Sequence, residues 1–490
     1  MENGRYEAVI GLEIHAELQT RSKMFCACSA DYAAASEPNT LICPVCTAQP
    51  GTLPVVNQRA IEQGIQVALA LNCSIPPLNV FARKNYYYPD LPKGYQISQY
   101  EMPLALNGWV EIHPKGESRP QRVRVRRVHL EEDTAKLFHQ GGETLVDFNR
   151  AGVPLLEIVS EPDMHSVEAV LAYAMHIRNV LRYLGVNSGD MQKGVLRFEA
   201  NVSVRPQGSQ ELRTRTEIKN LNSFRALVRA TAYEIRRQIA LYERGEQVSQ
   251  ETLGWDEGRE VTVPQRGKEH AHDYRYFPEP DLPPLEISPQ WVERLRASLP
   301  ELPEARLRRF VEGYGLSVSE ARTLVAEKPL ADYFEAVVTQ TKASAREVAN
   351  WMVGEFLRHL NERQLEVEAV PFPPQSMAQL LDLILQRAIT MASAKEVLRE
   401  MFASGRAPQR IIQERGFGQI SDENTLRTLV DQVLQENPDV VTAYLQGKES
   451  VFQWFMGQVA RATRGKADPQ VTRRLLQERL ESLRRNPPAR

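Results

Sequence analysis

Four cysteines lie within a short stretch of the chain, in two closely spaced pairs. The first pair is Cys26-Ala27-Cys28, and the second is Cys43-Pro44-Val45-Cys46. Two such pairs joined by a loop are typical of a tetrahedral zinc site with four thiolate ligands. Because four thiolates leave no open position on the metal, we expect this zinc to be structural. The alternative is four unrelated buried thiols, and we expect the isolated Cys73 to be a thiol of that kind.

Acidic residues and one histidine form a second set of possible metal ligands. Glu13 and His15 alternate with apolar residues from Gly11 to Leu18, so a strand there puts both side chains on one face. Further acids follow in the run His129-Leu130-Glu131-Glu132-Asp133 and at Glu157. Carboxylates suit Mg²⁺, which prefers oxygen ligands and bridges to phosphates. Taken singly, each acid is more often a surface or salt-bridge residue, and spacing alone does not show that distant segments converge.

Two further segments alternate in the same way. From Leu196 to Val204 the polar face carries Arg197, Glu199, Asn201 and Ser203, and from Leu212 to Lys219 it carries Arg213, Arg215, Glu217 and Lys219. Polar faces of antiparallel sheets are often simply solvated. The composition of these faces, with acids, arginine and asparagine, favours instead a charged hollow that holds a polyphosphate and its metal ions.

Basic and aromatic residues are concentrated in the run from Arg83 to Tyr95, which reads RKNYYYPDLPKGY. Its tyrosines could line a site or stack on a base, and they could equally anchor the loop on the core. Arg122, Arg124 and Arg126 alternate along another segment, where they could contact phosphates or balance neighbouring acids.

Two familiar catalytic motifs are missing from the sequence. It contains neither a Walker-type phosphate loop nor a Gly-x-Ser-x-Gly nucleophile elbow. Outside the two cysteine pairs, no thiol is a convincing glutaminase nucleophile. We therefore do not expect the chain to release ammonia from glutamine itself.

The composition is that of an ordinary globular protein, with 490 residues of which 42% are hydrophobic and 25% charged. The N-terminal residues lack the pattern of a signal peptide, and no run of about 18 apolar residues predicts a membrane helix. Closely paired thiols favour a reducing cytosol, so we expect a cytoplasmic protein without a membrane. The net charge of −2 excludes a uniformly basic nucleic-acid binder.

Three regions differ in composition. Residues 1–292 are rich in β-branched alternation, and prolines from Pro278 to Pro284 precede a helical pattern over 293–405. Residues 406–490 predict a small helical domain. From Arg461 to the end, nine Lys or Arg residues stand against three acids, which indicates either contact with an RNA backbone or an ordinary solvated helix face.

Several runs together resemble the GatB family, the B component of the tRNA-dependent amidotransferases. The matching runs are GLEIH (11–15), RKNYYYPDLPKGYQISQ (83–99), HLEED (129–133), VDFNRAGVPLLEIVSEPD (146–163), EANVSV (199–204), EIKNLNSF (217–224), DYRYFPEPDLPP (273–284), GQV (457–459) and ATRGK (462–466). The resemblance implies an α+β protein. An antiparallel-sheet cradle domain resembling glutamine synthetase would occupy residues 1–292, followed by an all-α helical domain over 293–405 and a YqeY-like, tRNA-binding tail domain over 406–490.

The resemblance also implies an activity. The family uses ATP and Mg²⁺ to phosphorylate the side-chain carboxylate of Glu on tRNA(Gln) or Asp on tRNA(Asn), and then amidates it. Ammonia arrives through a tunnel from the amidase partner, GatA, and the small partner GatC clasps the pair in a GatCAB heterotrimer. The sequence leaves open which tRNA is the natural substrate.

Matching motif positions assign roles to particular residues. The implied Mg²⁺ ligands are His15, Glu132 and Glu157, although the choice between Glu131 and Glu132 stays open. We expect Glu13, Lys84 and Glu199 to be catalytic, and Lys84, Arg197 and Lys219 to bind the nucleotide. Many relatives carry Asp at the position of Glu199, so its individual role is open. The frequent Ala-Gly after the acidic run is Thr134-Ala135 here, a small local change.

Two other classes of protein remain open. One is a free-standing ligase of the glutamine synthetase type that acts on a small acid. The other is a zinc-bearing RNA-binding protein without catalysis. The long helical C-terminal part and its basic end argue against the first of these.

Overall fold

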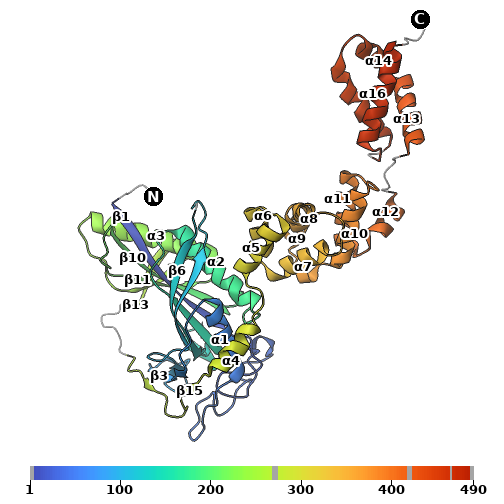
Figure 1. Ribbon diagram of the computed structural model, residues 1–490. Coiled ribbons are helices and arrows are strands. Elements are labelled where there is room, and N and C mark those ends of the chain that lie inside the picture. Colours follow the sequence, from blue (N-terminus) through green and yellow to red (C-terminus); the bar gives the residue numbers. More distant parts are fainter. Residues whose placement is uncertain (1–4, 118, 267–273, 417–421, 464–465, 486–490) are drawn as a thin grey trace. The chain divides into compact units, whose positions relative to one another are not determined.

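The computed structural model (Figure 1) describes residues 5–117, 119–266, 274–416, 422–463 and 466–485. The chain divides after Pro303 into an N-terminal unit and a C-terminal unit. The N-terminal unit combines sheets with helices, and the C-terminal unit is helical, so the fold is α+β. Over the described ranges, no helix is long and apolar enough to cross a membrane.

An eight-stranded sheet forms the centre of the N-terminal unit, in the order β13-β12-β11-β10-β1-β9-β6-β5. The strands are β1 (Tyr6–Glu17), β5 (Ala105–Ile112), β6 (Gln121–Glu132), β9 (Pro154–Ser160), β10 (Leu196–Pro206), β11 (Thr216–Leu221), β12 (Thr252–Asp256) and β13 (Val261–Arg266). Neighbouring strands run antiparallel, except that β11 and β12 are parallel. Strand β1 lies between β10 and β9, so residues of β1 have neighbours on both sides.

One face of this sheet is apolar and packs on helices. The helices are α1 (Gln58–Ala70), α2 (Val167–Tyr183) and α3 (Phe224–Glu243), and α4 (Pro289–Ala297) packs against α1. Leu12 and Ile14 of β1 are fully buried in the same core as residues of all four helices. Side-chain caps start the two long helices, because Ser166 accepts from Ala169 N and Ser223 accepts from Ala226 N. The period-2 alternation therefore leaves the charged residues on the opposite face.

Three small sheets complete the N-terminal unit. They pair β3 (Ala82–Asn85) with β4 (Tyr95–Ser98) and β14 (Phe277–Pro278), β2 (Leu78–Asn79) with β15 (Leu285–Glu286), and β7 (Lys136–Gln140) with β8 (Glu143–Asp147). Strand β4 is attached to the end of β6, where Gln96 Nε2 donates to the Glu132 carbonyl at 2.7 Å. This contact holds β3, the strand that carries Lys84, next to the large sheet.

Two of the three alternating segments form the expected strands. Strand β1 contains the segment predicted from Gly11 to Leu18 except its last residue, and β10 contains the whole segment from Leu196 to Val204, which confirms those two strands. The third strand begins only at Thr216, because Thr216 pairs with Val202 and the residues before it are in no strand. Arg213 lies outside the strand and its guanidinium packs over the Tyr242 ring at 4.5 Å.

The C-terminal unit is built from helices. They are α5 (Pro303–Tyr314), α6 (Val318–Val325), α7 (Lys328–Val338), α8 (Ala345–Trp351), α9 (Leu357–Arg363), α10 (Pro374–Leu385), α11 (Met391–Ser404), α12 (Pro408–Arg415), α13 (Glu423–Glu436), α14 (Pro438–Leu445), α15 (Phe452–Ala462) and α16 (Pro469–Arg485). A short π-helix, Met352–Phe356, joins α8 to α9. Helices α13, α15 and α16 share a separate apolar core that includes Leu426, Phe455 and Leu476.

Candidate active site

The polar face of the large sheet collects side chains from four strands. His15 of β1 lies opposite Glu157 of β9 on one side and opposite Arg197 of β10 on the other. His129 of β6 in turn lies opposite Glu157. The strand register therefore brings together residues that are more than 100 positions apart in the sequence.

Two histidines and two glutamates form the tightest group on this face. His15 Nε2 lies 3.3 Å from a carboxylate oxygen of Glu157 and 3.8 Å from one of Glu131. His129 Nε2 lies 3.2 Å from Glu157 and 3.6 Å from Glu131. His15, Glu131 and Glu157 each offer a ligand atom within 4.8 Å of the other two. This donor set fits a divalent cation.

Glu132, which the family resemblance implied as a metal ligand, is not in this group. Its carboxylate accepts a hydrogen bond from Ile97 N at 3.0 Å and pairs with Lys93 Nζ at 2.6 Å. The physical reason is the pleat of β6, which points consecutive side chains to opposite faces. The structure thus brings Glu131, and not Glu132, to His15 and Glu157.

A second group of acids lies along the same face, formed by Glu13, Glu199 and Glu217, whose carboxylates also lie within 4.8 Å of one another. Glu13 lies opposite Glu199 in the ladder of β1 and β10. Lys219 Nζ lies 3.0 Å from Glu199 and 3.5 Å from Glu217. Burial raises the pKa of Glu13, and the charges of Glu157 and Glu199 raise it further. A cation would relieve this repulsion.

The three lysine and arginine side chains expected at a nucleotide all line one pocket of about 280 Å³. Lys84 enters it from β3, Arg197 from β10 and Lys219 from β11. His15, Glu131 and Glu199 line the same pocket. The three cations, His15 and Glu199, which the sequence singled out, are therefore brought to one cavity.

Opposite charges in the pocket stabilise one another and shift the pKa values of its residues. Burial lowers the pKa of His15, but the hydrogen bond to Glu157 and the carboxylates of Glu157, Glu199 and Glu131 raise it to about 9. Burial likewise lowers the pKa of Lys84, which Glu131 and other neighbours more than offset. Arg197 donates to Asp133 at 2.8 Å, and this arginine keeps the pKa of Asp133 at about 2 despite burial.

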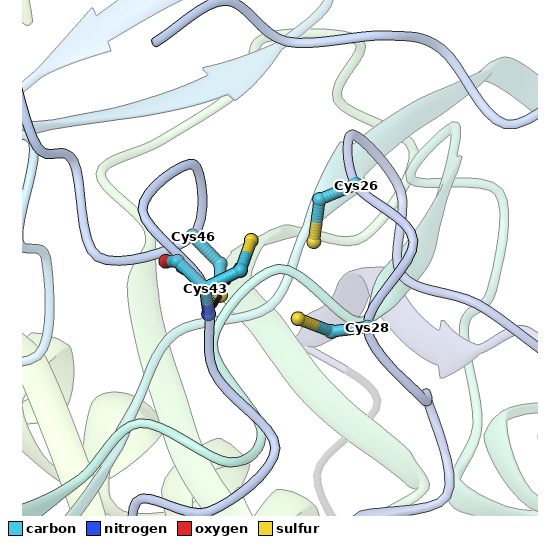
Figure 2. A group of neighbouring side chains, drawn as sticks. All are labelled: Cys26, Cys28, Cys43 and Cys46. Carbon is cyan, nitrogen blue, oxygen red and sulfur yellow. Dashed lines mark hydrogen bonds between the residues drawn. The ribbon is translucent and has the colours of Figure 1, made fainter.

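The four clustered cysteines come together from two loops, as Figure 2 shows. The Sγ atoms of Cys26, Cys28, Cys43 and Cys46 lie within 4.8 Å of one another. A hydrogen bond from the Cys26 thiol lowers the pKa of Cys46 to about 4, so a thiolate forms readily there. The four-sulfur set fits a tetrahedral metal ion such as zinc. Cys73 is buried away from them, as expected, and packs against Leu71.

A buried lysine lies next to this cysteine group. Lys23 is 1% exposed, and its ammonium donates to the carbonyls of Leu41 at 2.8 Å and Phe148 at 3.3 Å. The same ammonium lies 3.8 Å from Cys46 Sγ. Sequence reasoning missed this residue, because only its place in the fold distinguishes it from a surface lysine.

Other residues of the site were also missed. Arg127 was not singled out, and His129 and Glu217, although noted on the polar segments, were assigned no individual role. The period-2 alternation with Glu131 and Lys219 was the signal that could have found all three. Arg124 and Arg126 instead pair with Asp163 and Glu161, so these two arginines balance neighbouring acids.

Comparison with known proteins places the chain in a class. A family model described as the GatB/GatE catalytic domain matches residues 8–293, and one described as the GatB domain matches residues 332–480. The chain thus has a GatB/GatE catalytic domain, and the sheet with its charged pocket lies inside it.

Two curated relatives identify the family more closely. The B subunit of the aspartyl/glutamyl-tRNA(Asn/Gln) amidotransferase of Moorella thermoacetica is 54% identical over 479 residues, which cover 97% of this chain and 100% of the relative. The B subunit from Thermomicrobium roseum is 51% identical over 480 residues, 97% of this chain and 99% of the relative. The chain belongs to this family, the B subunits of aspartyl/glutamyl-tRNA(Asn/Gln) amidotransferases, as its motifs indicated.

Proposed function

We propose that this chain is the subunit that activates a carboxylate with ATP and Mg²⁺ and converts it to an amide on misacylated tRNA. The substrates are Glu on tRNA(Gln), Asp on tRNA(Asn), or both. The relatives' name supports the tRNA substrates and the amide transfer. The observation that carries the ATP-dependent step is one pocket lined by three cations, Lys84, Arg197 and Lys219. His15 and Glu131 of the first acid group and Glu199 of the second line the same pocket.

His15, Glu131 and Glu157 would hold one Mg²⁺, and Glu13, Glu199 and Glu217 fit a second. Such ions, when bound, neutralise charge on the transferring phosphoryl group. The proposal that the N-terminal unit is a cradle of the glutamine synthetase type rests on the same feature, an antiparallel sheet with a charged face.

The chemistry requires a leaving group, because a carboxylate does not expel oxide at neutral pH. Transfer of the γ-phosphoryl group of ATP to the carboxylate oxygen gives an acyl phosphate and ADP. Attack of ammonia on the acyl carbon then breaks the bond to the phosphate oxygen, giving the amide and inorganic phosphate. Lys84, Arg197 and Lys219 would bind the phosphates by charge and orient them. Glu13 and Glu199 would orient the reacting groups.

Ammonia is proposed to come from a partner amidase, GatA, through a tunnel, with the small partner GatC completing the heterotrimer. Cys73 is buried and unsuited to be a nucleophile for glutamine, which supports an external source. Zn²⁺ on Cys26, Cys28, Cys43 and Cys46 would be structural, since four thiolates fill a tetrahedral shell.

The C-terminal residues 406–490 are proposed to bind tRNA. Arg461 on α15 and Arg473, Arg474, Arg479, Arg484 and Arg485 on α16 are exposed. Arg464 and Arg490 belong to the same basic stretch but lie outside the described residues. Exposed arginines along helices suit the phosphate backbone of RNA, where binding releases counterions.

One assay tests the whole proposal. The protein with its two partner proteins is incubated with ATP, Mg²⁺, ammonium and either Glu-tRNA(Gln) or Asp-tRNA(Asn). We expect the amide on the tRNA and one ADP for each amide formed. A small free acid in place of the charged tRNA tests the free-standing ligase, and RNA binding without ADP release would leave only a binding protein. Either of these outcomes refutes the proposal.

A further inference from the structure

Four tyrosine rings form a row beside the charged pocket. Ring centroids are 5.9 Å apart for Tyr86 and Tyr274, 6.3 Å for Tyr274 and Tyr276, and 4.3 Å for Tyr276 and Tyr100. The Lys84 ammonium lies 5.1 Å from the centroid of Tyr274, and Tyr86 lines the pocket itself. The row therefore begins at a cation of the pocket and ends at Tyr100.

The outer end of the row is a parallel stack. The rings of Tyr100 and Tyr276 are inclined by only 12°. Tyr100 is 47% exposed, so its ring is fixed by Tyr276 and yet open to solvent. A tyrosine that only anchors a loop on the core would bury its ring. A fixed and open aromatic ring is instead suited to stacking with a ligand.

Arg127 connects this stack to the acid group. Its guanidinium lies 5.7 Å from the centroid of Tyr100, and its Nη2 lies 4.0 Å from Glu157. Its Nε is buried and, within the part of the chain that the structure describes, has no hydrogen-bond partner. A buried donor without an acceptor is costly, which points to a ligand that supplies the acceptor.

We propose that Tyr100 and Tyr276 form a platform on which an adenine ring stacks, with Arg127 Nε donating a hydrogen bond to the bound nucleoside. This inference rests on the proposed function, since both substrates of that reaction carry adenine. One source is the base of ATP, and the other is the 3′-terminal adenosine that bears the amino acid on tRNA. In either case the reacting group would reach from the platform toward Lys84 and the acids.

The test uses the complete heterotrimer with Tyr100→Ala and Tyr100→Phe. Loss of an aromatic stacking partner weakens binding by roughly 5- to 100-fold, so Tyr100→Ala should raise one KM by about tenfold while kcat stays near the wild-type value. Tyr100→Phe keeps the ring and should restore the KM. KM for ATP is measured at saturating aminoacyl-tRNA, and KM for aminoacyl-tRNA at saturating ATP. The KM that rises shows whether the platform binds the adenine of ATP or the terminal adenine of the tRNA.

Tyr6→Ala is the matched control. It disrupts another stacked tyrosine pair, with Tyr242 at 6.2 Å and 17°, at the end of β1 that is remote from His15. Both KM values should stay unchanged in this variant. The platform is refuted if Tyr100→Ala unfolds at the wild-type temperature and leaves both KM values unchanged, or if it lowers kcat alone. An inactive wild-type heterotrimer would instead refute the proposed function, so the two failures are distinguishable.

Discussion

Glu131 and Glu132 are consecutive in β6, and their carboxylates lie on opposite faces of the strand. Glu131 accepts a hydrogen bond from Ser98 Oγ at 3.1 Å and faces His15 across 3.8 Å. Glu132 pairs with Lys93 at 2.6 Å and accepts from a backbone N–H. Two chemically identical neighbours thus have different surroundings, one within a set of possible metal ligands and the other within a neutralised ion pair.

This difference predicts opposite effects for the two glutamine variants. Glu131→Gln removes a ligand oxygen, so the Mg²⁺ concentration needed for ATP-dependent amidation should rise roughly a hundredfold. Glu132→Gln leaves the Lys93 ammonium without its counter-charge. It should lower the free energy of unfolding by about 2–3 kcal/mol while the Mg²⁺ dependence is retained. Mg²⁺ titrations of amidation and thermal unfolding of both variants provide the measurement, and exchanged phenotypes would contradict the assignment.

The large strands and the face that carries charge were predictable because alternation is a local property of the chain. Glu13 with His15, and Arg197 with Glu199, share a face wherever a strand forms. The same rule would have chosen Glu131 over Glu132, since His129 and Glu131 lie two residues apart. The family motif implied Glu132, and the choice between the two acids stayed open.

Contacts between distant segments could not be predicted from local sequence patterns. That His15 meets Glu157 depends on β1 lying between β10 and β9, which no pattern within β1 determines. Lys23 and Arg127 likewise acquire their roles from neighbours more than twenty residues away along the chain. The strand expected over 212–219 was too long at its start because alternation continued beyond the pairing with β10.

Lys23 should control how tightly the cysteine group holds a metal. Its buried ammonium offsets the negative charge of the thiolates and ties Cys46 to the carbonyls of Leu41 and Phe148. Lys23→Met keeps the length of the side chain but removes its charge, so the affinity for zinc should fall by roughly 10- to 100-fold. Competition with a chromophoric chelator measures this affinity, and exposed Lys115→Met is the control. Equal zinc retention by both variants would show that Lys23 has no such role.

The arginines of α16 should contribute to the salt dependence of tRNA binding. Arg473 and Arg484 are exposed and, among the described residues, have no ion pair, whereas Arg474 and Arg479 pair with Glu423 and Asp431. Each lost phosphate contact reduces the slope of log K against log salt by roughly 0.7–0.9. The double variant of Arg473 and Arg484 to Ala should therefore reduce the slope by about 1.5. Filter binding over a range of salt concentrations measures this slope, with Gln477→Ala as the control. An unchanged slope in the double variant would show that α16 does not contact the tRNA.

Glu335 should make the C-terminal unit sensitive to acid. Burial raises the pKa of Glu335, but hydrogen bonds from Arg309, Arg306 and Tyr314 outweigh this and lower it to about 2. Because the folded-state pKa lies below the unfolded value of about 4.3, the stabilisation is fully present above that value and is lost as the pH falls toward 2.

Glu335→Gln should therefore cost about 1–2 kcal/mol of unfolding free energy at pH 7, a figure reduced for the partial exposure of the carboxylate. The difference from the wild type should shrink below about pH 4.3 and vanish below about pH 2, where both side chains are neutral. Denaturant unfolding of the full chain at a series of pH values gives the two curves. Glu312→Gln, an exposed acid of α5, should match the wild type throughout. A stability gap that persists undiminished to pH 2 would mean that the lost contacts are steric and do not depend on the charge of Glu335.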